Sequence, residues 1–264
     1  MPLFLLGVGT GSDFLSRPHV PSARARREIT MLNDCAAFSG ARDVMTLEWL
    51  RRLGVSKATL SGDPATFIFN RPVWRPEAGG PVMITVPPLR FWSSKRQLLN
   101  VRVRGRAMFK AIVALARNLS GQGHEVVVTC NDPADWPLAR RLFADWPPGR
   151  LLCPQSPEEY FRLLSESRAL VSGRLHTAVV ALSLGIPFVL MDVDQRTRGF
   201  VDTYGLGDWS LTPSARGTAP RLAELTAAVL GGDAPGSWEV FTGRRDRMYA
   251  RAMGLLGDAL RLVR

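Results

Sequence analysis

The residue types best suited to chemistry stand together in one short segment of the chain, Ser172-Gly173-Arg174-Leu175-His176. Arg174 carries a planar guanidinium that matches the geometry of a carboxylate or a phosphate. His176 titrates near neutral pH and is therefore suited to proton transfer. Together they predict a site that binds an anion and moves a proton. The alternative is that Arg174 pairs with a nearby acidic residue and that His176 only caps or packs; finding both residues at one strand end favours function.

The neighbouring elements are predicted to place this segment at the edge of a sheet. Residues 169–171 form a predicted strand and residues 175–184 a predicted helix, with Ser172 or Gly173 as its N-cap. A helix N-terminus attracts anions because it presents unpaired N–H groups and the positive end of the helix dipole. Ligands of open α/β sheets bind beyond the carboxyl ends of the strands.

Asp192 is a further candidate on the same rule, because it follows the predicted strand 187–191. With Asp194 it is expected either to orient a substrate hydroxyl or His176, or to pair with Arg196 and Arg198 on the surface.

Strand and helix signals alternate along the chain, which predicts an α/β fold of mostly parallel sheets covered on both faces. The predicted strands are residues 2–6, 36–39, 58–60, 82–86, 124–129, 151–153, 169–171 and 187–191. The predicted helices are residues 22–33, 43–53, 105–119, 136–144, 157–165, 175–184, 220–230 and 237–262. Proline and glycine residues between Asn70 and Gly80 mark a linker. We therefore expect a partial N-terminal α/β domain over 1–75 and a Rossmann-like domain with closing helices over 76–264.

The composition is that of a globular protein with anionic partners. Hydrophobic residues are 46% of the 264, which suffices for a buried core, and 22% charged residues argue against wholesale disorder. The net charge of +11 favours phosphorylated small molecules, anionic lipid or nucleic acid as partners. Cys35, Cys130 and Cys153 have no metal-ligand or disulfide spacing, so free thiols, no metal and a cytoplasmic location are predicted. The longest apolar stretch, 178–191, is shorter than the ~20 residues of a membrane-spanning helix.

One basic segment, residues 78–124, contains no acidic residue and interleaves aromatic side chains with arginines and lysines. A solvated basic face is as good an interpretation as a peripheral contact with the inner face of a membrane. Nucleic acid is disfavoured because no helix-turn-helix, zinc-finger or RRM signature accompanies the charge.

Three segments of the chain, in their order and spacing, resemble the polysaccharide pyruvyl transferases. The Ser-x-Arg-Leu-His segment is followed by an apolar helix and by Leu184-Gly185-Ile186-Pro187-Phe188. Upstream, Ala41-Arg42-Asp43 and Gly62-Asp63-Pro64-Ala65 match a second segment of that family. Arg90 and Trp92 match a third. The resemblance extends from residue 2 to the last helix.

The resemblance implies two Rossmann-like, GT-B-like halves, with 76–264 as the donor-binding domain. It also implies transfer of pyruvate from phosphoenolpyruvate to a sugar, forming a ketal of a cell-surface polysaccharide or its precursor. It implies that His176 is the catalytic acid/base and that Arg174 and Arg42, with Arg90 as a weaker candidate, hold the donor. Ser172, Gly173, Leu175 and Asp192 complete the expected substrate-binding set. The donor is a substrate, so no cofactor is expected.

A glycine-rich Gly-Asn-x-Gly-Asp segment that members usually carry near the start is not found. The first half is therefore expected to be shortened. Two alternatives to the transferase remain open: a GT-B-type glycosyltransferase with a nucleotide-sugar donor, and a catalytically silent, truncated relative that binds ligands.

Overall fold

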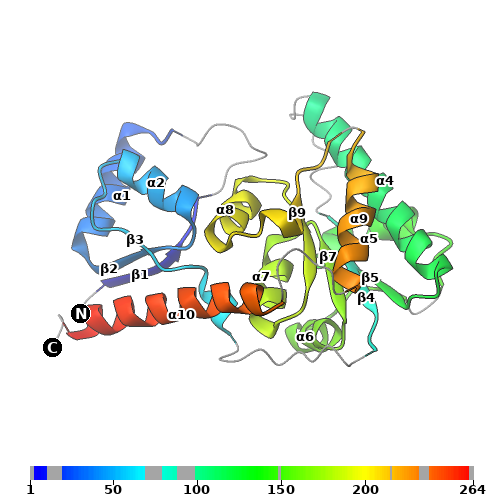
Figure 1. The fold of residues 1–264 in the computed structure, drawn as a ribbon. Coiled ribbons are helices and arrows are strands. Elements are labelled where there is room, and N and C mark those ends of the chain that lie inside the picture. The colour runs from blue at the N-terminus through cyan, green and yellow to red at the C-terminus, as the bar shows by residue number, and fades with distance from the viewer. Residues whose placement is uncertain are drawn as a thin grey trace.

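The computed structural model describes residues 3–10, 20–68, 79–87, 99–147, 150–214, 216–231 and 238–261. Within these ranges the chain forms two parallel sheets, each with its own helices (Figure 1). The first sheet has the order β1-β2-β3, with strands β1 (Leu3–Val8), β2 (Ala36–Ala41) and β3 (Thr59–Leu60). It carries helices α1 (Ala23–Cys35) and α2 (Val44–Arg52). The short 3-10 turn η1 (Pro64–Phe67) follows β3 and packs against α7 (Leu175–Leu184).

The second sheet has six parallel strands in the order β6-β5-β4-β7-β8-β9. Its strands are β4 (Val82–Thr85), β5 (Val126–Thr129), β6 (Leu151–Leu152), β7 (Ala169–Ser172), β8 (Phe188–Met191) and β9 (Ser210–Leu211). The chain runs outward from β4 to the β6 edge, then returns to the other side of β4 and runs outward again to β9. This reversal makes β4 and β7 the topological switch point, where open α/β sheets bind their ligands.

Helices cover both faces of the second sheet because its strands are apolar on both sides. Val82 and Ile84 pack in one hydrophobic cluster and Met83 in another, and all three are fully buried. The first cluster also holds side chains of α4 (Leu99–Gly121), α5 (Trp136–Leu142) and α9 (Thr218–Gly231). The second holds those of α6 (Pro157–Ser165), α7 (Leu175–Leu184) and α8 (Gln195–Tyr204). Period-two alternation in a buried strand accounts for this division.

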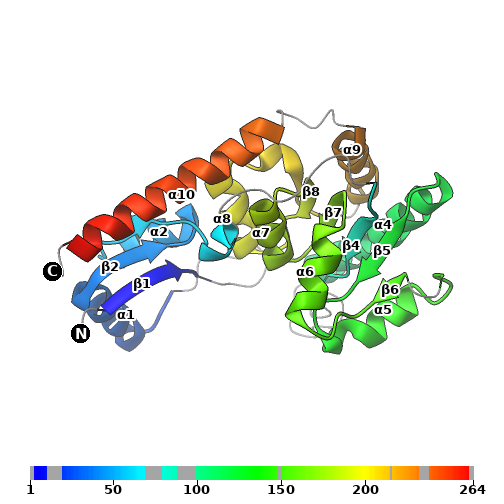
Figure 2. The same cartoon turned by 90° about the horizontal axis from the view of Figure 1, so that it is seen from below.

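The two sheets are tied together by α8 and by the long helix α10 (Trp238–Arg261), which packs against both α7 and β2 and runs along the first sheet (Figure 2). The N–H of Val44, the first residue of α2, donates to the hydroxyl of Thr203 on α8 at 2.9 Å. The buried hydroxyl of Tyr204 accepts from the N–H of Asp63 at 3.3 Å and bonds that of Thr66 at 3.0 Å. These contacts place the end of α8 between the sheets.

The predicted fold class is confirmed, and most predicted elements lie within a few residues of the observed ones. Two elements were missed, α8 and β9, because the polar sequence 195–204 has no strong apolar period. Helix α4 begins at Leu99 rather than at residue 105. The predicted domain boundary between 75 and 76 separates the two sheets, but residues 69–78 lie outside the described ranges, so that boundary stays a prediction.

Candidate active site

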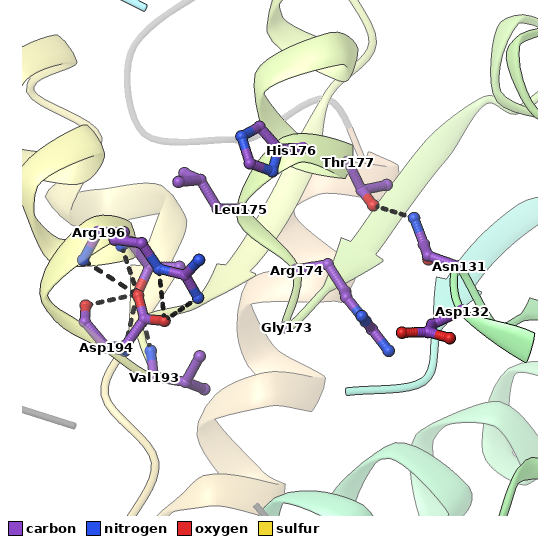
Figure 3. A pocket seen from close by; sticks show the side chains of 11 residues that line it. Asn131, Asp132, Gly173, Arg174, Leu175, His176, Thr177, Val193, Asp194 and Arg196 are labelled. Atoms are coloured by element: carbon purple, nitrogen blue, oxygen red, sulfur yellow. Dashed lines mark hydrogen bonds and ion pairs between the residues drawn. The ribbon is translucent and has the colours of Figure 1, made fainter. Parts of the chain in front are cut away.

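A cavity of about 340 Å³ lies at the carboxyl ends of β5, β7 and β8. Its lining comes from the segments after these strands and from the first turns of α7 and α8: Asn131, Asp132, Gly173, Arg174, Leu175, His176, Thr177, Val193, Asp194, Arg196 and Thr197. Arg174 extends toward the wall formed by Asn131 and Asp132, and Asp194 and Arg196 form the opposite wall (Figure 3). The cavity therefore occupies the position that the topology favours for a ligand.

Arg174 is held at the start of α7 by a hydrogen-bonded strand end. The buried hydroxyl of Ser172 accepts from the N–H of Arg174 at 2.9 Å and bonds the hydroxyl of Thr85 on β4 at 2.7 Å. The predicted N-cap at Ser172 or Gly173 was wrong: Arg174 is the N-cap and its side chain does not cap the helix. The reason is that Ser172 remains in β7 and uses its hydroxyl to turn the chain out of the sheet.

The Arg174 guanidinium is fixed by groups from two different strands. Its Nε donates to the carbonyl of Val86, after β4, at 3.2 Å. One of its terminal nitrogens forms an ion pair with the buried carboxylate of Asp135, which lies after β5. The alternative expectation that Arg174 pairs with an acidic residue thus holds, yet Arg174 still lines the cavity, with 17% of its side chain exposed.

His176 lies in the first turn of α7, is exposed, and lines the same cavity. In the view of Figure 3 its imidazole lies above the side chains of Arg174 and Arg196. The first N–H groups of a helix have no partner inside the helix. An anion placed here therefore meets the start of α7 and Arg174, with an imidazole beside it.

A group of three polar side chains braces the wall of the cavity at Asn131. The Asn131 amide donates to the hydroxyls of Tyr160 and Thr177, at 2.9 Å each. The Tyr160 hydroxyl donates to that of Thr177 at 2.6 Å. Burial raises the pKa of Tyr160 to about 12, so this hydroxyl stays protonated and keeps donating. Tyr160 and Thr177 thereby join α6 and the first turn of α7 to the end of β5.

The opposite wall is a network of carboxylates and arginines around the start of α8. Asp194 caps α8, and the Nε of Arg196 donates to its carboxylate at 3.0 Å. Asp192 is fully buried and forms an ion pair with Arg198 at 3.1 Å. Burial raises the pKa of Asp192, and the charge of Arg198 opposes that shift. The predicted pairing with arginines is thus found, but the expectation of a surface position was wrong, since Asp192 and Asp194 are both buried.

The structure brings Gly173, Arg174, Leu175 and His176 together in one lining. Ser172 and Asp192 are buried beneath the cavity and do not line it. Arg42 lies on the first sheet's side, where its side chain packs on Gly9 and forms an ion pair with Asp43 at 3.2 Å. Arg90 lies outside the described residues.

Sequence reasoning missed Asn131, Thr177 and their partner Tyr160. A signal for Asn131 was present, because it lies two residues after the predicted strand 124–129. Tyr160 carried no such signal, since it reaches the site only through the packing of α6 against α7.

Within the described ranges, no group of three or more His, Cys, Asp or Glu side chains is arranged to hold a metal ion. In the same part of the chain, no helix combines the length and the apolar character needed to cross a membrane.

The fold and the cavity define a class of protein, the α/β proteins with two parallel sheets and a cavity at the carboxyl edge of the second. The model of the polysaccharide pyruvyl transferase family matches residues 1–195. The chain therefore belongs to that family. No curated protein matches the chain in sequence.

Solved structures similar to this chain have GT-B-like folds. UDP-GlcNAc 2-epimerase from Neisseria meningitidis, bound to UDP-GlcNAc, has a TM-score of 0.54 at 14% identity, covering 98% of this chain and 69% of its own. The Methanocaldococcus jannaschii UDP-GlcNAc 2-epimerase has a TM-score of 0.52 at 12% identity, covering 84% and 63%. A mutant of S. aureus TarM has a TM-score of 0.52 at 9% identity, covering 99% and 50%. The chain thus spans between half and about two thirds of the length of these proteins, and at such identities the likeness shows the fold alone.

Proposed function

We propose that this protein transfers pyruvate from phosphoenolpyruvate to two hydroxyl groups of a saccharide, forming a ketal and releasing phosphate. The observation that carries the proposal is the placement of Arg174 and His176 on one helix N-terminus, lining one cavity. Family membership supplies the reaction class. The proposed acceptor is a cell-surface polysaccharide or its lipid-linked precursor, with the basic segment 78–124 as a peripheral membrane contact.

The donor carries a carboxylate and a phosphate, so its site needs more than one fixed positive group. Arg174 offers a guanidinium already oriented by Val86 and Asp135, and the first turn of α7 offers backbone N–H groups. Arg196 lies across the cavity as a second cation, partly neutralised by Asp194. In this proposal Arg42 and Arg90 bind the donor from outside this lining.

His176 is the proposed proton donor. Protonation of the donor's methylene carbon generates an oxocarbenium-like centre at the neighbouring carbon. One sugar hydroxyl attacks that carbon, a second hydroxyl displaces the phosphate oxygen, and both C–O bonds of the ketal are then formed. Of the two hydroxyl protons, one replaces the proton that His176 gave to the methyl group and the other leaves with phosphate. General acid/base catalysis of this kind contributes roughly 10²–10⁴-fold in rate.

Ser172 and Asp192 are proposed to act without touching the substrate. Ser172 fixes the backbone of Arg174, and Asp192 orders the start of α8 through Arg198 and Thr197, whose hydroxyl donates to its carboxylate at 3.0 Å. Gly173 and Leu175 shape the lining beside the donor.

Calorimetric titration of phosphoenolpyruvate and of a panel of UDP-sugars tests the proposal. We expect wild type to bind phosphoenolpyruvate and Arg174→Ala to bind it roughly 10- to 100-fold more weakly, since a hydrogen bond to a charged group contributes about 1.5–3 kcal/mol. The variant Arg140→Ala loses the same charge at an exposed position on α5 outside the cavity, and should bind as wild type does. His176→Ala should keep most of the affinity.

Phosphate release from phosphoenolpyruvate, measured with a panel of saccharides bearing neighbouring hydroxyls, separates binding from chemistry. His176→Ala should abolish release while binding is kept. Binding of UDP-sugars alone would replace the proposal with a glycosyltransferase. A well-folded protein that binds neither ligand would identify a silent relative.

A further inference from the structure

Two cysteines meet across neighbouring strands at the edge of the second sheet. Strands β5 and β6 pair in parallel with Val128 opposite Leu151 and Thr129 opposite Leu152. The next pair in this register is Cys130 and Cys153, and the N–H of Cys130 still donates to the carbonyl of Leu152 at 3.1 Å. Paired residues of parallel strands point to the same face, and strands lie about 4.8 Å apart. That spacing falls within the Cα separation that a disulfide spans, about 4.4–6.8 Å.

The side chains are positioned as this register requires. Cys130 is fully buried in the hydrophobic cluster on the α4 face, and Cys153 packs against that same cluster. Burial, and then the Cys153 thiol beside it, raise the pKa of Cys130 to about 12. Cys153 remains partly exposed because β6 is the edge strand. An oxidant arriving from solvent therefore reaches Cys153 first and finds a second thiol behind it.

We propose that Cys130 and Cys153 form a reversible disulfide when the protein meets a hydroperoxide. The Cys153 sulfur attacks the peroxide, the O–O bond breaks, and an alcohol (water for hydrogen peroxide) leaves a sulfenic acid. The Cys130 sulfur then attacks that of Cys153, the S–O bond breaks, and water leaves with the Cys130 proton. Two thiols lose two electrons in total and one hydroperoxide is reduced. The Cys153 sulfur of the bridge stays partly exposed, so a thiol can attack it there and restore the starting state.

The bridge would act on the candidate active site through the chain next to it. Asn131 and Asp132, the residues after Cys130, line the cavity. A bond that draws Cys130 toward β6 displaces the neighbouring Asn131, whose amide donates to the hydroxyls of Tyr160 and Thr177. Oxidation is therefore expected to loosen the wall beside Arg174.

The test uses the whole chain with Cys35→Ser, which removes the exposed third thiol. One equivalent of hydrogen peroxide should remove two hydrogen atoms from the intact mass, peptide mapping should join the peptides of Cys130 and Cys153, and dithiothreitol should reverse both changes. A Cys35→Ser, Cys153→Ser double variant should show no such loss, with thermal unfolding as the check on its fold. Accumulation of sulfenic or sulfinic acid on Cys153 without the joined peptides would overturn the proposal.

The mass measurement does not depend on which group the protein transfers. The disulfide proposal can therefore fail while the proposed function holds, and the proposed function can fail while the disulfide forms. Hydrogen exchange of the backbone at 131–135 gives the matching readout on the cavity wall. Faster exchange there in the oxidised form is expected, and unchanged exchange would overturn the coupling to the site.

Discussion

At the residue scale, the candidate site depends on side chains that are already oriented before a ligand arrives. Arg174 is held by a carbonyl after β4 and a carboxylate after β5, and its own backbone is held by Ser172. Groups fixed in this way need little reorganisation when charge develops on a bound molecule. The cost is that Asp135 neutralises part of the Arg174 charge, so additional cations such as Arg196 are needed for a donor with two anionic groups.

The Tyr160 hydroxyl gives the first prediction at this scale. Tyr160→Phe removes the two hydrogen bonds that join Tyr160 to Asn131 and Thr177, whereas the bond between Asn131 and Thr177 remains. We expect a loss of about 1–2 kcal/mol in the free energy of unfolding, measured by urea denaturation. Tyr249→Phe on α10, where the ring contacts Phe67, is the matched change and should cost less than about 0.5 kcal/mol. Equal losses of unfolding free energy in the two variants would show that the Tyr160 hydroxyl does not stabilise the cavity wall.

The buried carboxylate of Asp192 gives a prediction about pH. Burial raises its folded-state pKa above the unfolded value of about 3.9, so the folded state binds more protons between these two pKa values. The free energy of unfolding should therefore fall as pH rises from the unfolded pKa to the folded pKa, and Asp192→Asn should flatten this contribution. Denaturant titrations from about pH 4 to neutral measure it, with Asp208→Asn at an exposed position as control. An unchanged slope in Asp192→Asn would contradict the assignment.

At the element scale, α7 and α10 show how differently two helices of one chain are stabilised. Helix α7 is almost wholly buried apart from His176 and ends at Gly185 in a left-handed conformation, with φ of 87°. Helix α10 is long, and its last turns are largely exposed, with Gly254 and Gly257 inside the helix. The left-handed end of α7 thus requires a glycine, whereas the glycines inside α10 only lower the stability of that helix.

Alanine substitutions should therefore have opposite signs in the two helices. Gly185→Ala forces a Cβ into the left-handed region and should lower the free energy of unfolding by about 1–2 kcal/mol. Gly254→Ala, where an added Cβ meets open space, should raise it by about 0.5–1 kcal/mol through helix propensity. Chemical denaturation of both variants measures the two values. A loss on Gly254→Ala would mean that the last turns of α10 are not stably helical.

At the scale of the whole molecule, the two sheets meet where α8 approaches α2. Gly199 on α8 lies so close to Asp43 that an added Cβ would stand 2.7 Å from its carboxyl carbon. Nearby, the hydroxyl of Thr203 accepts the first N–H of α2. The start of α8 also lines the candidate active site, so this one helix links the cavity to the first sheet.

Gly199→Ala tests that contact. Helix propensity alone would favour alanine, but the clash with Asp43 should dominate and lower the free energy of unfolding by about 1–3 kcal/mol. Small-angle scattering should show a slightly larger radius of gyration, because the sheets must move apart. Gly207→Ala, in open space after α8, is the control and should change neither quantity. A neutral or stabilising Gly199→Ala would mean that α8 and α2 do not pack closely in solution.

The α/β class and most strands and helices could be predicted from the sequence alone. The segment Ser172–His176 was predicted as the centre of the site, and its residues Gly173 to His176 line the cavity. These features depend on neighbours in the chain: apolar period, turn residues and the position of polar groups after a strand. Because only Leu175 separates Arg174 from His176, their shared location was predictable without any long-range contact.

The distant residues that complete the candidate site became visible only in the folded chain. Strand order brought Asn131 and Asp135, from the end of β5, beside Arg174, and packing of α6 on α7 added Tyr160. The unpredicted strand β9 pairs with β8, which helps explain why Asp192 is buried rather than on the surface. Arg42, matched to the same function by resemblance, lies on the other sheet. Local patterns fix where an element begins and ends; which elements become neighbours depends on burial of apolar surface across the whole chain, which no local pattern encodes.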